Sequence, residues 1–189
     1  MNYSGKILPL IIAPDPLLKR VSDQIEKVDN EIRQLMDDMI STMYKENGIG
    51  LSAVQIGILK RVLVIDVSYK LEDCDGDHDH HNHSHDIYDQ VPIFMANPQL
   101  IKSAKENSVY NEGCLSFPEI RAQIERPKEV VIKYLDYNNE EKILEATGLL
   151  ATCVQHEIDH LNGIVFLDHL SKLKKEMIMK KIVKKNKIS

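Results

Sequence analysis

QHEIDHL, residues 155–161, is the stretch around which we expect the fold to be built. Residues four positions apart lie on one face of an α-helix, so His156 and His160 can both reach one cation at about 2.0–2.1 Å. Glu157 lies beside that face, where it can contact a metal-bound water rather than the metal. H-E-x-x-H on a helix is typical of a hydrolytic metal site in which the glutamate is the general base.

The third metal ligand separates the enzyme classes that share this motif. One metalloprotease pattern requires a third histidine at position 166, where this chain has Phe166. The other needs a downstream glutamate, but Glu176 stands among lysines and fits a solvated helix face better. Cys114, in the run EGCLSFP (112–118), is the best remaining ligand, since a thiolate binds zinc at about 2.3 Å. The alternative for a lone cysteine is a small buried apolar residue.

A glycine-rich segment, GIGLSAVQIG, occupies residues 48–57. It lacks the Lys-Ser/Thr ending of a P-loop and the G-x-G-x-x-G spacing of a dinucleotide site. We therefore do not expect it to bind phosphate.

Taken in order, these three segments closely resemble the peptide deformylase family. The family patterns G-x-G-L-A-A-x-Q, E-G-C-L-S and Q-H-E-x-D-H-L stand here as GIGLSAVQ (48–55), EGCLS (112–116) and QHEIDHL (155–161). The one departure within them is Ser52, where the family usually has alanine. The resemblance runs from about residue 7 to about residue 173, apart from an insertion near 70–90.

This resemblance implies an enzyme that hydrolyses the N-formyl group on the initiator methionine of newly made polypeptides and releases formate. It implies metal ligation by Cys114, His156 and His160, with Glu157 as general base. It assigns stabilisation of the oxyanion to the Gln55 side-chain amide and the backbone N–H of Leu115. The residues that it places around the substrate are Ile49, Gly50, Glu112, Gly113, Phe117, Arg121, Thr152 and Cys153.

We expect one divalent metal per chain, and two arguments about its identity diverge. Two histidines and one cysteine with an open position suggest zinc on general grounds. The resemblance implies Fe(II) in the cell, with zinc, nickel or cobalt in purified protein. Cys153 has two interpretations, a second thiolate ligand or an apolar wall residue, and the wall is favoured. Asp159 either orients a ligand or a nearby arginine, or forms an ordinary helix ion pair.

Length and composition favour a single domain over residues 1–189, since 189 residues with 43% hydrophobic content can bury one sizeable core. The net charge of −5 argues against DNA as a partner. Three cysteines without a signal-peptide pattern do not indicate a disulfide framework, and no apolar run approaches the ~20 residues that span a bilayer. We expect a cytoplasmic monomer without membrane contact.

The pattern of the remaining chain predicts an α+β fold with mixed, mainly antiparallel sheets packed around a central metal-binding helix, and a C-terminal helix. Asp29 can cap a helix with an apolar stripe from Ile32 to Met43, which Gly48 would end. Thr147 can cap the metal-binding helix and Gly163 close it. Strands are expected at 61–67, 92–98, 128–137 and 141–147, the last two joined by a turn at Asn138–Asn139.

Two segments depart from a plain enzyme core. Residues 71–90 hold seven acidic residues, five of the eight histidines and Cys74, but no Lys or Arg. This stretch is either a weak auxiliary metal site or a solvated loop insertion between strands. A non-catalytic metal-binding protein would have to depend on it.

The second segment is the C-terminal tail, where a basic helix is expected at about 169–186, with His169 at its start as a surface or capping residue. Residues 172–189 carry eight lysines against one glutamate, a local charge of +7, so the rest of the chain carries −12. Leu173, Met177, Ile178 and Ile182 are expected near one face. The helix either packs by this face or docks on a polyanion, which for an enzyme of nascent chains would be ribosomal RNA.

Overall fold

The computed structural model describes residues 5–68 and 91–186 of the chain. The N-terminal part holds the 3-10 helix η1 (Pro16–Lys19), helix α1 (Asn30–Lys45), strand β1 (Gly50–Ser52), the 3-10 helix η2 (Ala53–Ile56) and strand β2 (Val62–Ile65). The strands that follow are β3 (Ile93–Ser103), β4 (Asn107–Gly113), β5 (Arg121–Pro127), β6 (Glu129–Leu135) and β7 (Glu141–Thr147). The chain ends with helix α2 (Gly148–Leu161), the 3-10 helix η4 (Phe166–His169) and helix α3 (Lys172–Asn186). The predicted His- and Asp-rich insertion lies outside the described residues.

The strands form two sheets, and the pairings between the named strands are all antiparallel. Five strands follow the order β1-β2-β3-β6-β7, while β4 pairs with β5 alone. The predicted hairpin joins β6 to β7, and Asn139 has the positive φ of 65° that its turn requires. This α+β architecture confirms the predicted fold class.

Strands β4 and β5 were not predicted from the sequence. Their segments, NSVYNEG and RAQIERP, are polar, and most of their residues are exposed or half-buried. They contain no apolar run, because only one face of this small sheet contacts the rest of the protein. β3 is also longer than predicted, since it extends beyond Pro98 to Ser103.

Helix α1 follows the predicted pattern. The Asp29 side chain accepts a hydrogen bond from the Ile32 backbone, and the apolar stripe from Ile32 to Met43 is buried. The helix ends at Lys45 rather than at Gly48, and it is Asn47 that adopts the left-handed conformation, with φ 55°. Asparagine tolerates that conformation better than most residues, so it closed the helix before the glycine.

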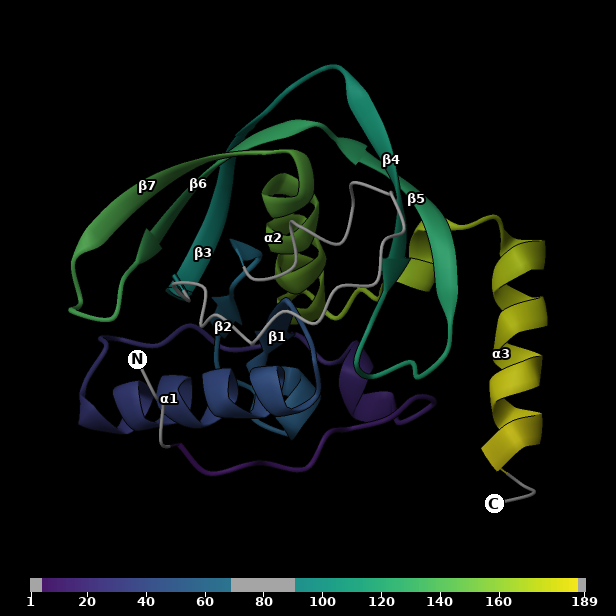
Figure 1. Ribbon diagram of the computed structural model, residues 1–189, viewed down its shortest axis with the longest axis horizontal. Coiled ribbons are helices and arrows are strands. Elements are labelled where there is room, and N and C mark those ends of the chain that lie inside the picture. Colours follow the sequence, from purple (N-terminus) through teal and green to yellow (C-terminus); the bar gives the residue numbers. More distant parts are fainter. Residues whose placement is uncertain (1–4, 69–90, 187–189) are drawn as a thin grey trace, which may run out of the picture.

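Helix α2 is the central element. Figure 1 shows it between the large curved sheet and the β4–β5 pair, with α1 below. Ten of its fourteen residues are buried. Thr147 occupies the predicted N-cap position, although its side chain makes no capping hydrogen bond, and the helix ends at Leu161, two residues before Gly163. A Cβ atom at Gly163 would lie 2.5 Å from the Lys19 carbonyl oxygen, so this close approach admits only glycine.

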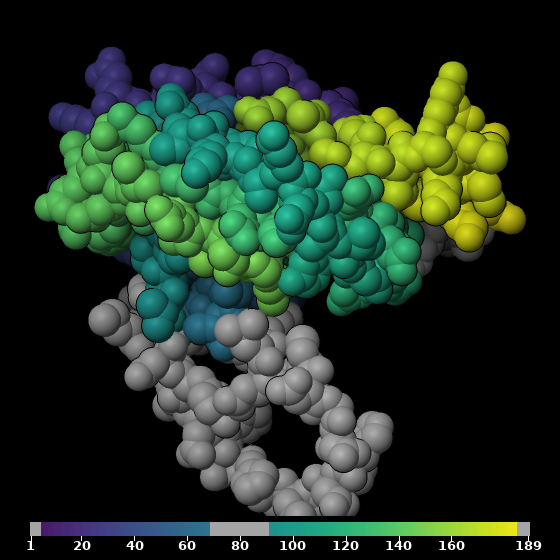
Figure 2. All heavy atoms as spheres, turned by 90° about the horizontal axis from the view of Figure 1, so that it is seen from above, coloured from purple at the N-terminus to yellow at the C-terminus, as the bar shows by residue number. Residues whose placement is uncertain are grey.

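Helix α3 lies at the edge of the molecule beside β4 and β5 (Figures 1 and 2), and it begins at Lys172 rather than at 169. Ile178, Met179 and Ile182 pack against a buried apolar cluster around Phe166. This cluster consists of Ala13, Leu18, Phe117, Ile124, Val165, Phe166 and Leu167.

The prediction that the apolar residues of α3 lie near one face was wrong. Leu173 and Met177 are 69% and 55% exposed, while Ile178 and Ile182 are partly buried. A helix turns about 100° per residue, so Met177 and Ile182 lie about 140° apart around the axis. These four apolar residues therefore divide into a packed pair and an exposed pair.

In the described part of the chain, no helix combines the length and apolar character needed to cross a membrane.

Asp168 fastens α3 to the body of the protein. Its carboxylate pairs with Lys19 at the end of η1 and, at 2.5 Å, with Lys175 on α3, and it also accepts a hydrogen bond from the Val165 backbone. Although burial opposes ionisation, the two lysines and the backbone bond lower the pKa of Asp168 from 3.8 to about 2.

We predict that Asp168→Asn lowers the free energy of unfolding by about 1 kcal/mol at pH 7, because solvent screens these partly exposed pairs. The pKa is lower in the folded state, so this stabilisation is present above the unfolded value of 3.8 and is lost as the pH falls toward about 2. Urea unfolding of both proteins between pH 7 and pH 2.5 checks this. Glu176→Gln, at an exposed position on the same helix, is the control. A difference that does not shrink below pH 4 would contradict the assignment.

Candidate active site

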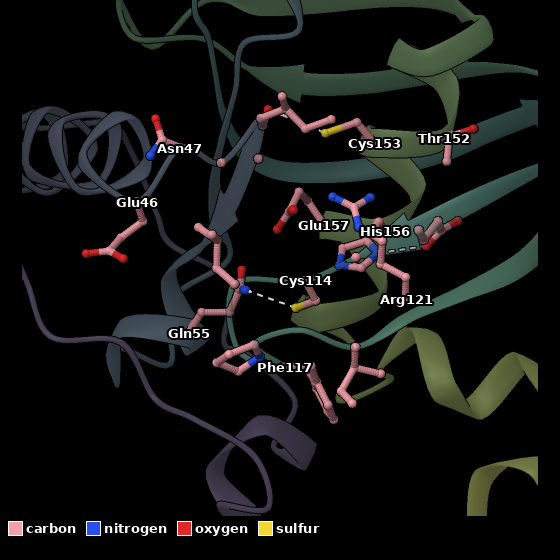
Figure 3. A pocket seen from close by; sticks show the side chains of 18 of the residues that line it. Glu46, Asn47, Gln55, Cys114, Phe117, Arg121, Thr152, Cys153, His156 and Glu157 are labelled. Carbon is pink, nitrogen blue, oxygen red and sulfur yellow. Dashed lines mark hydrogen bonds and ion pairs between the residues drawn. The ribbon is translucent and has the colours of Figure 1, made fainter. Parts of the chain in front are cut away.

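All of the predicted site residues except His160 line one pocket of about 590 Å³, and His160 is buried next to it beside Cys114. Its walls come from the 46–50 loop, the end of β4 with the turn that follows, and one side of α2. Figure 3 shows Cys114 and Gln55 facing each other below Glu157 and His156. Segments far apart in the sequence therefore converge on a single cavity.

Cys114, His156 and His160 bring three metal-binding atoms together, all within 4.8 Å of one another. The Cys114 Sγ and His160 Nε2 atoms lie 3.2 Å apart. A tetrahedral site with bonds of about 2.0–2.3 Å holds its donor atoms roughly 3.5 Å apart. Two imidazoles and one thiol at this spacing thus fit one divalent cation. The imidazoles come from α2, and the thiol comes from the turn that follows β4.

The surroundings of the two histidines shift their pKa values in opposite directions. Burial would lower the pKa of His156, but its contacts with Cys114 and Glu112 raise that pKa well above 6.5. Burial and the neighbouring His156 lower the pKa of His160 well below 6.5. A histidine binds a metal in its neutral form, so a cation at these donors would displace the proton from His156.

Glu112 holds the ring of His156 from behind. Its Oε2 atom lies 2.8 Å from His156 Nδ1, which leaves Nε2 of that ring for a metal. The Arg126 guanidinium binds both carboxylate oxygens, with Nε 2.5 Å from Oε1 and Nη2 3.1 Å from Oε2. Burial opposes the charge on Glu112, but His156 and Arg126 outweigh it, and the pKa of Glu112 is lowered.

Asp159 and His169 complete this network. The Arg126 Nη1 atom donates to Asp159 Oδ2 at 2.7 Å, and His169 Nε2 lies 2.7 Å from the same oxygen. This geometry matches the interpretation that Asp159 orients a nearby arginine. His169 belongs to η4 and contacts Asp159, so its expected place at the start of the last helix was wrong.

Glu157 is 3% exposed, and its Oε2 atom accepts a hydrogen bond from Ser52 Oγ at 2.7 Å. Burial raises the pKa of Glu157, and the Ser52 contact opposes this rise. A Cβ atom at Gly50 would lie 2.5 Å from Glu157 Oε1 and 2.8 Å from Cys153 Sγ. Only a glycine allows β1 to approach the carboxylate this closely.

Gln55, in η2, is 1% exposed and has a fixed orientation. Its Oε1 atom accepts a hydrogen bond from the Ser52 backbone at 2.8 Å. Its Nε2 atom therefore points the other way, toward Cys114 Sγ at 3.5 Å and Ser116 Oγ at 3.3 Å. The donor side of the amide thus faces the metal-binding group.

The other predicted site residues line the same pocket, namely Leu115, Ile49, Gly50, Glu112, Gly113, Phe117, Arg121, Thr152 and Cys153. Cys153 stands apart from the three metal-binding atoms, and its Sγ lies 3.5 Å from the Ile49 carbonyl oxygen. Burial and the Glu157 charge raise the pKa of its thiol well above 9.0. These facts match the wall interpretation of Cys153.

Further lining residues escaped the sequence argument: Leu10, Glu46, Asn47, Tyr110, Asn111, Glu119 and Ile120. Most of them flank the three motifs by a few positions. Proximity to a motif was the one signal that could have suggested them.

Comparison with known proteins agrees with this geometry. The family model for polypeptide deformylase matches residues 7–176. A peptide deformylase of Rhizobium meliloti (strain 1021) is 47% identical over 178 residues, 94% of this chain and 93% of that protein. A crystal structure of peptide deformylase from Ehrlichia chaffeensis has a TM-score of 0.84 and 42% identity, covering 97% of this chain and 98% of that one.

A third relative was solved with a bound peptide. The Met-Ala-Ser-bound class I type b peptide deformylase of Acinetobacter baumannii has a TM-score of 0.74 and 32% identity, covering 87% of this chain and 98% of that one. With its family model, its fold and its three motifs in agreement, the chain belongs to the polypeptide deformylase family, metal-dependent hydrolases that remove the N-formyl group from nascent polypeptides.

Proposed function

We propose that this chain performs deformylation with Glu157 as general base beside a cation held by Cys114, His156 and His160. The observation that carries this proposal is the position of the Glu157 carboxylate. It lines the same pocket as Cys114 and His156 and is buried there, 3% exposed. Water exclusion of this kind strengthens each electrostatic interaction within a site.

A divalent cation at these three donors would supply a Lewis acid that lowers the pKa of water from 15.7 toward about 7. Glu157 accepts a proton from the attacking water and returns one to the leaving amine. The water oxygen bonds to the formyl carbon, the carbon–nitrogen bond breaks, and formate leaves. The raised pKa of Glu157 suits a group that must both accept and donate.

Negative charge develops on the formyl oxygen as water adds. Gln55 Nε2 and the backbone N–H of Leu115 donate to this oxygen in our proposal. The fixed orientation of the Gln55 amide supports it, since its carbonyl is held by Ser52. A preorganised donor of this kind typically contributes about 10²–10³ in kcat.

Glu112 and Arg126 support the metal-binding residues without binding the metal themselves in our proposal. We assign Glu112 to the orientation of His156, because both of its oxygens are already engaged by Arg126 and the imidazole. Groups that orient a metal ligand in this way typically affect metal affinity or activity by about 10–100-fold. The substrate contacts fall to the other lining residues.

The methionine side chain of the substrate would occupy the apolar part of the pocket. Ile49, Gly50, Phe117, Thr152 and Cys153 form that part, and Gly113 and Arg121 lie toward the peptide beyond it. β1 is at the end of the five-strand order, so an extended peptide can pair with its outer edge. Such a pocket distinguishes one methylene by only about 1–3 kcal/mol, so selectivity among apolar residues should be moderate.

We predict that Glu157→Gln retains the fold and the metal but loses about 10²–10⁴-fold in kcat on a formyl-methionyl peptide. The two side chains are nearly isosteric, and Glu157 is not a ligand in this proposal. Cys114→Ser is the matched contrast, because it should lose metal as well as turnover. Metal analysis and formate release check both variants. Full activity of Glu157→Gln would exclude the assignment, and turnover of acetylated or internal amides would favour a protease instead.

Fe(II) is the metal that we propose for the cell, with zinc, nickel or cobalt entering during purification. Two imidazoles and one thiolate suit all four of these borderline-soft metals, so the donor set does not decide among them. We predict that protein purified without oxygen contains iron and has the highest activity, and that air exposure lowers both together. Metal analysis paired with turnover measures this. Activity that follows zinc content instead would contradict it.

Helix α3 has a second role in our proposal, the docking of the enzyme on ribosomal RNA. Its exposed side carries Leu173 and Met177 together with Lys180, Lys181 and Lys184, while the opposite side packs on the body. The basic residues are thus free of the packing that holds the helix. The substrate emerges from the ribosome, so we also propose that the protein acts in the cytoplasm, as a monomer.

Replacing Lys180, Lys181 and Lys184 with glutamine should weaken co-sedimentation with ribosomes and leave turnover of short formyl peptides unchanged. Loss of three phosphate contacts should reduce the slope of log K against log salt by roughly 2–3. The control replaces the exposed Lys27, Lys102 and Lys105, which changes the net charge equally. Equal loss in both triple variants would indicate a net-charge effect and contradict docking by α3. Substitution is preferable to truncation, because Ile178 and Ile182 pack on the core.

A further inference from the structure

Ser52 departs from the deformylase motif, in which alanine usually stands at this position. It is the last residue of β1 and is 0% exposed. Its Oγ atom lies 2.7 Å from Glu157 Oε2 and 2.8 Å from the Glu157 carbonyl oxygen. Relative to the usual motif, this chain therefore adds a hydroxyl that makes two close contacts with Glu157, the proposed general base.

The hydroxyl has one proton and two neighbouring acceptors, so one contact must dominate. An ionised carboxylate is the stronger acceptor, and hydrogen bonds to it are roughly twice as strong as neutral ones. Oε2 is therefore the partner of Ser52 while Glu157 is ready to act as a base.

Anchoring one oxygen fixes where the other lies. The Oε1 atom of Glu157 is on the side of Gly50, where a Cβ atom would be only 2.5 Å away. Gly50 lines the pocket, as does Glu157 itself. With Oε2 held by Ser52, Oε1 is the carboxylate oxygen on the Gly50 side, and Gly50 is part of the pocket wall.

Ser52 also fixes the second predicted catalytic group, but through a different atom. Its backbone N–H donates to Gln55 Oε1 at 2.8 Å, which turns Nε2 of that amide toward Cys114. This contact does not involve the serine side chain, so a substitution that removes the hydroxyl leaves it intact. The effect on Glu157 can therefore be measured separately.

We propose that Ser52 is a positioning residue for deformylation, whose hydroxyl holds Glu157 by Oε2 so that Oε1 faces the reacting groups. The proposal rests on the role of Glu157 given above. Ser52 does not touch the substrate in this arrangement, so its contribution belongs to the chemical step and not to binding.

Steady-state kinetics of Ser52→Ala on a formyl-methionyl peptide tests this. We expect kcat to fall about 3- to 10-fold, the size of one lost hydrogen bond, with KM within about 2-fold of wild type and the metal content unchanged. The matched control is Ser41→Ala. Ser41, on α1, is also a buried serine, but its Oγ accepts a hydrogen bond from the Gly5 backbone and it does not line the pocket. It should lower thermal stability and leave kcat unchanged.

A double-mutant cycle shows whether Ser52 acts through Glu157. Ser52→Ala should have no further effect on the residual rate of Glu157→Gln if Ser52 serves the carboxylate. An undiminished effect in that background, or a change in KM alone, would overturn the proposal. If Ser52→Ala is fully active while Glu157→Gln is inactive, only the role of Ser52 fails. If Glu157→Gln is itself active, the proposed function fails instead.

Discussion

The site depends on the buried link that Glu112 makes between the β4–β5 pair and α2. Glu112 is two residues before Cys114 and contacts His156, while Arg126 on the neighbouring strand contacts Glu112 and Asp159. Removing two such charges from water costs about as much as their attraction returns, so this link is weak evidence for stability. Its consequence is geometric, because it sets the small sheet against the helix and brings Cys114 to within 3.2 Å of His160.

Small residues make the remaining approach possible. Gly50 lets the end of β1 lie against Glu157, and Cys153 occupies the wall beside it without reaching the metal-binding atoms. Glu157, the proposed general base, is thereby buried, and its hydrogen bond with Ser52 compensates part of the cost of that burial. The Ser52 backbone also holds Gln55, so the two proposed catalytic side chains share one support.

Helix α3 joins the enzyme core by two kinds of contact. Ile178, Met179 and Ile182 pack on the cluster around Phe166, whose ring lies 5.8 Å from that of His156. Asp168, two residues after Phe166, holds Lys175. Because these contacts occupy one side of the helix, its exposed lysines remain available to a partner without disturbing the packing next to the metal site.

The sequence by itself determined the features that depend on local spacing. The two histidines and Glu157 follow from the helical repeat, α1 follows from its cap and apolar stripe, and the β6–β7 turn follows from Asn139. These patterns involve residues a few positions apart, where backbone geometry fixes the relation between side chains.

Only the tertiary structure decided the relations between distant residues. Ser52 and Glu157 are 105 positions apart, and Glu112 and His156 are 44 apart. No local pattern carries such a contact, because it depends on how the elements pack. The polar strands β4 and β5 escaped prediction for the same reason. Glu112 in β4 and Arg126 in β5 are charged residues, which a sequence argument places on the surface. In the structure they are buried, and Arg126 pairs with both Glu112 and Asp159.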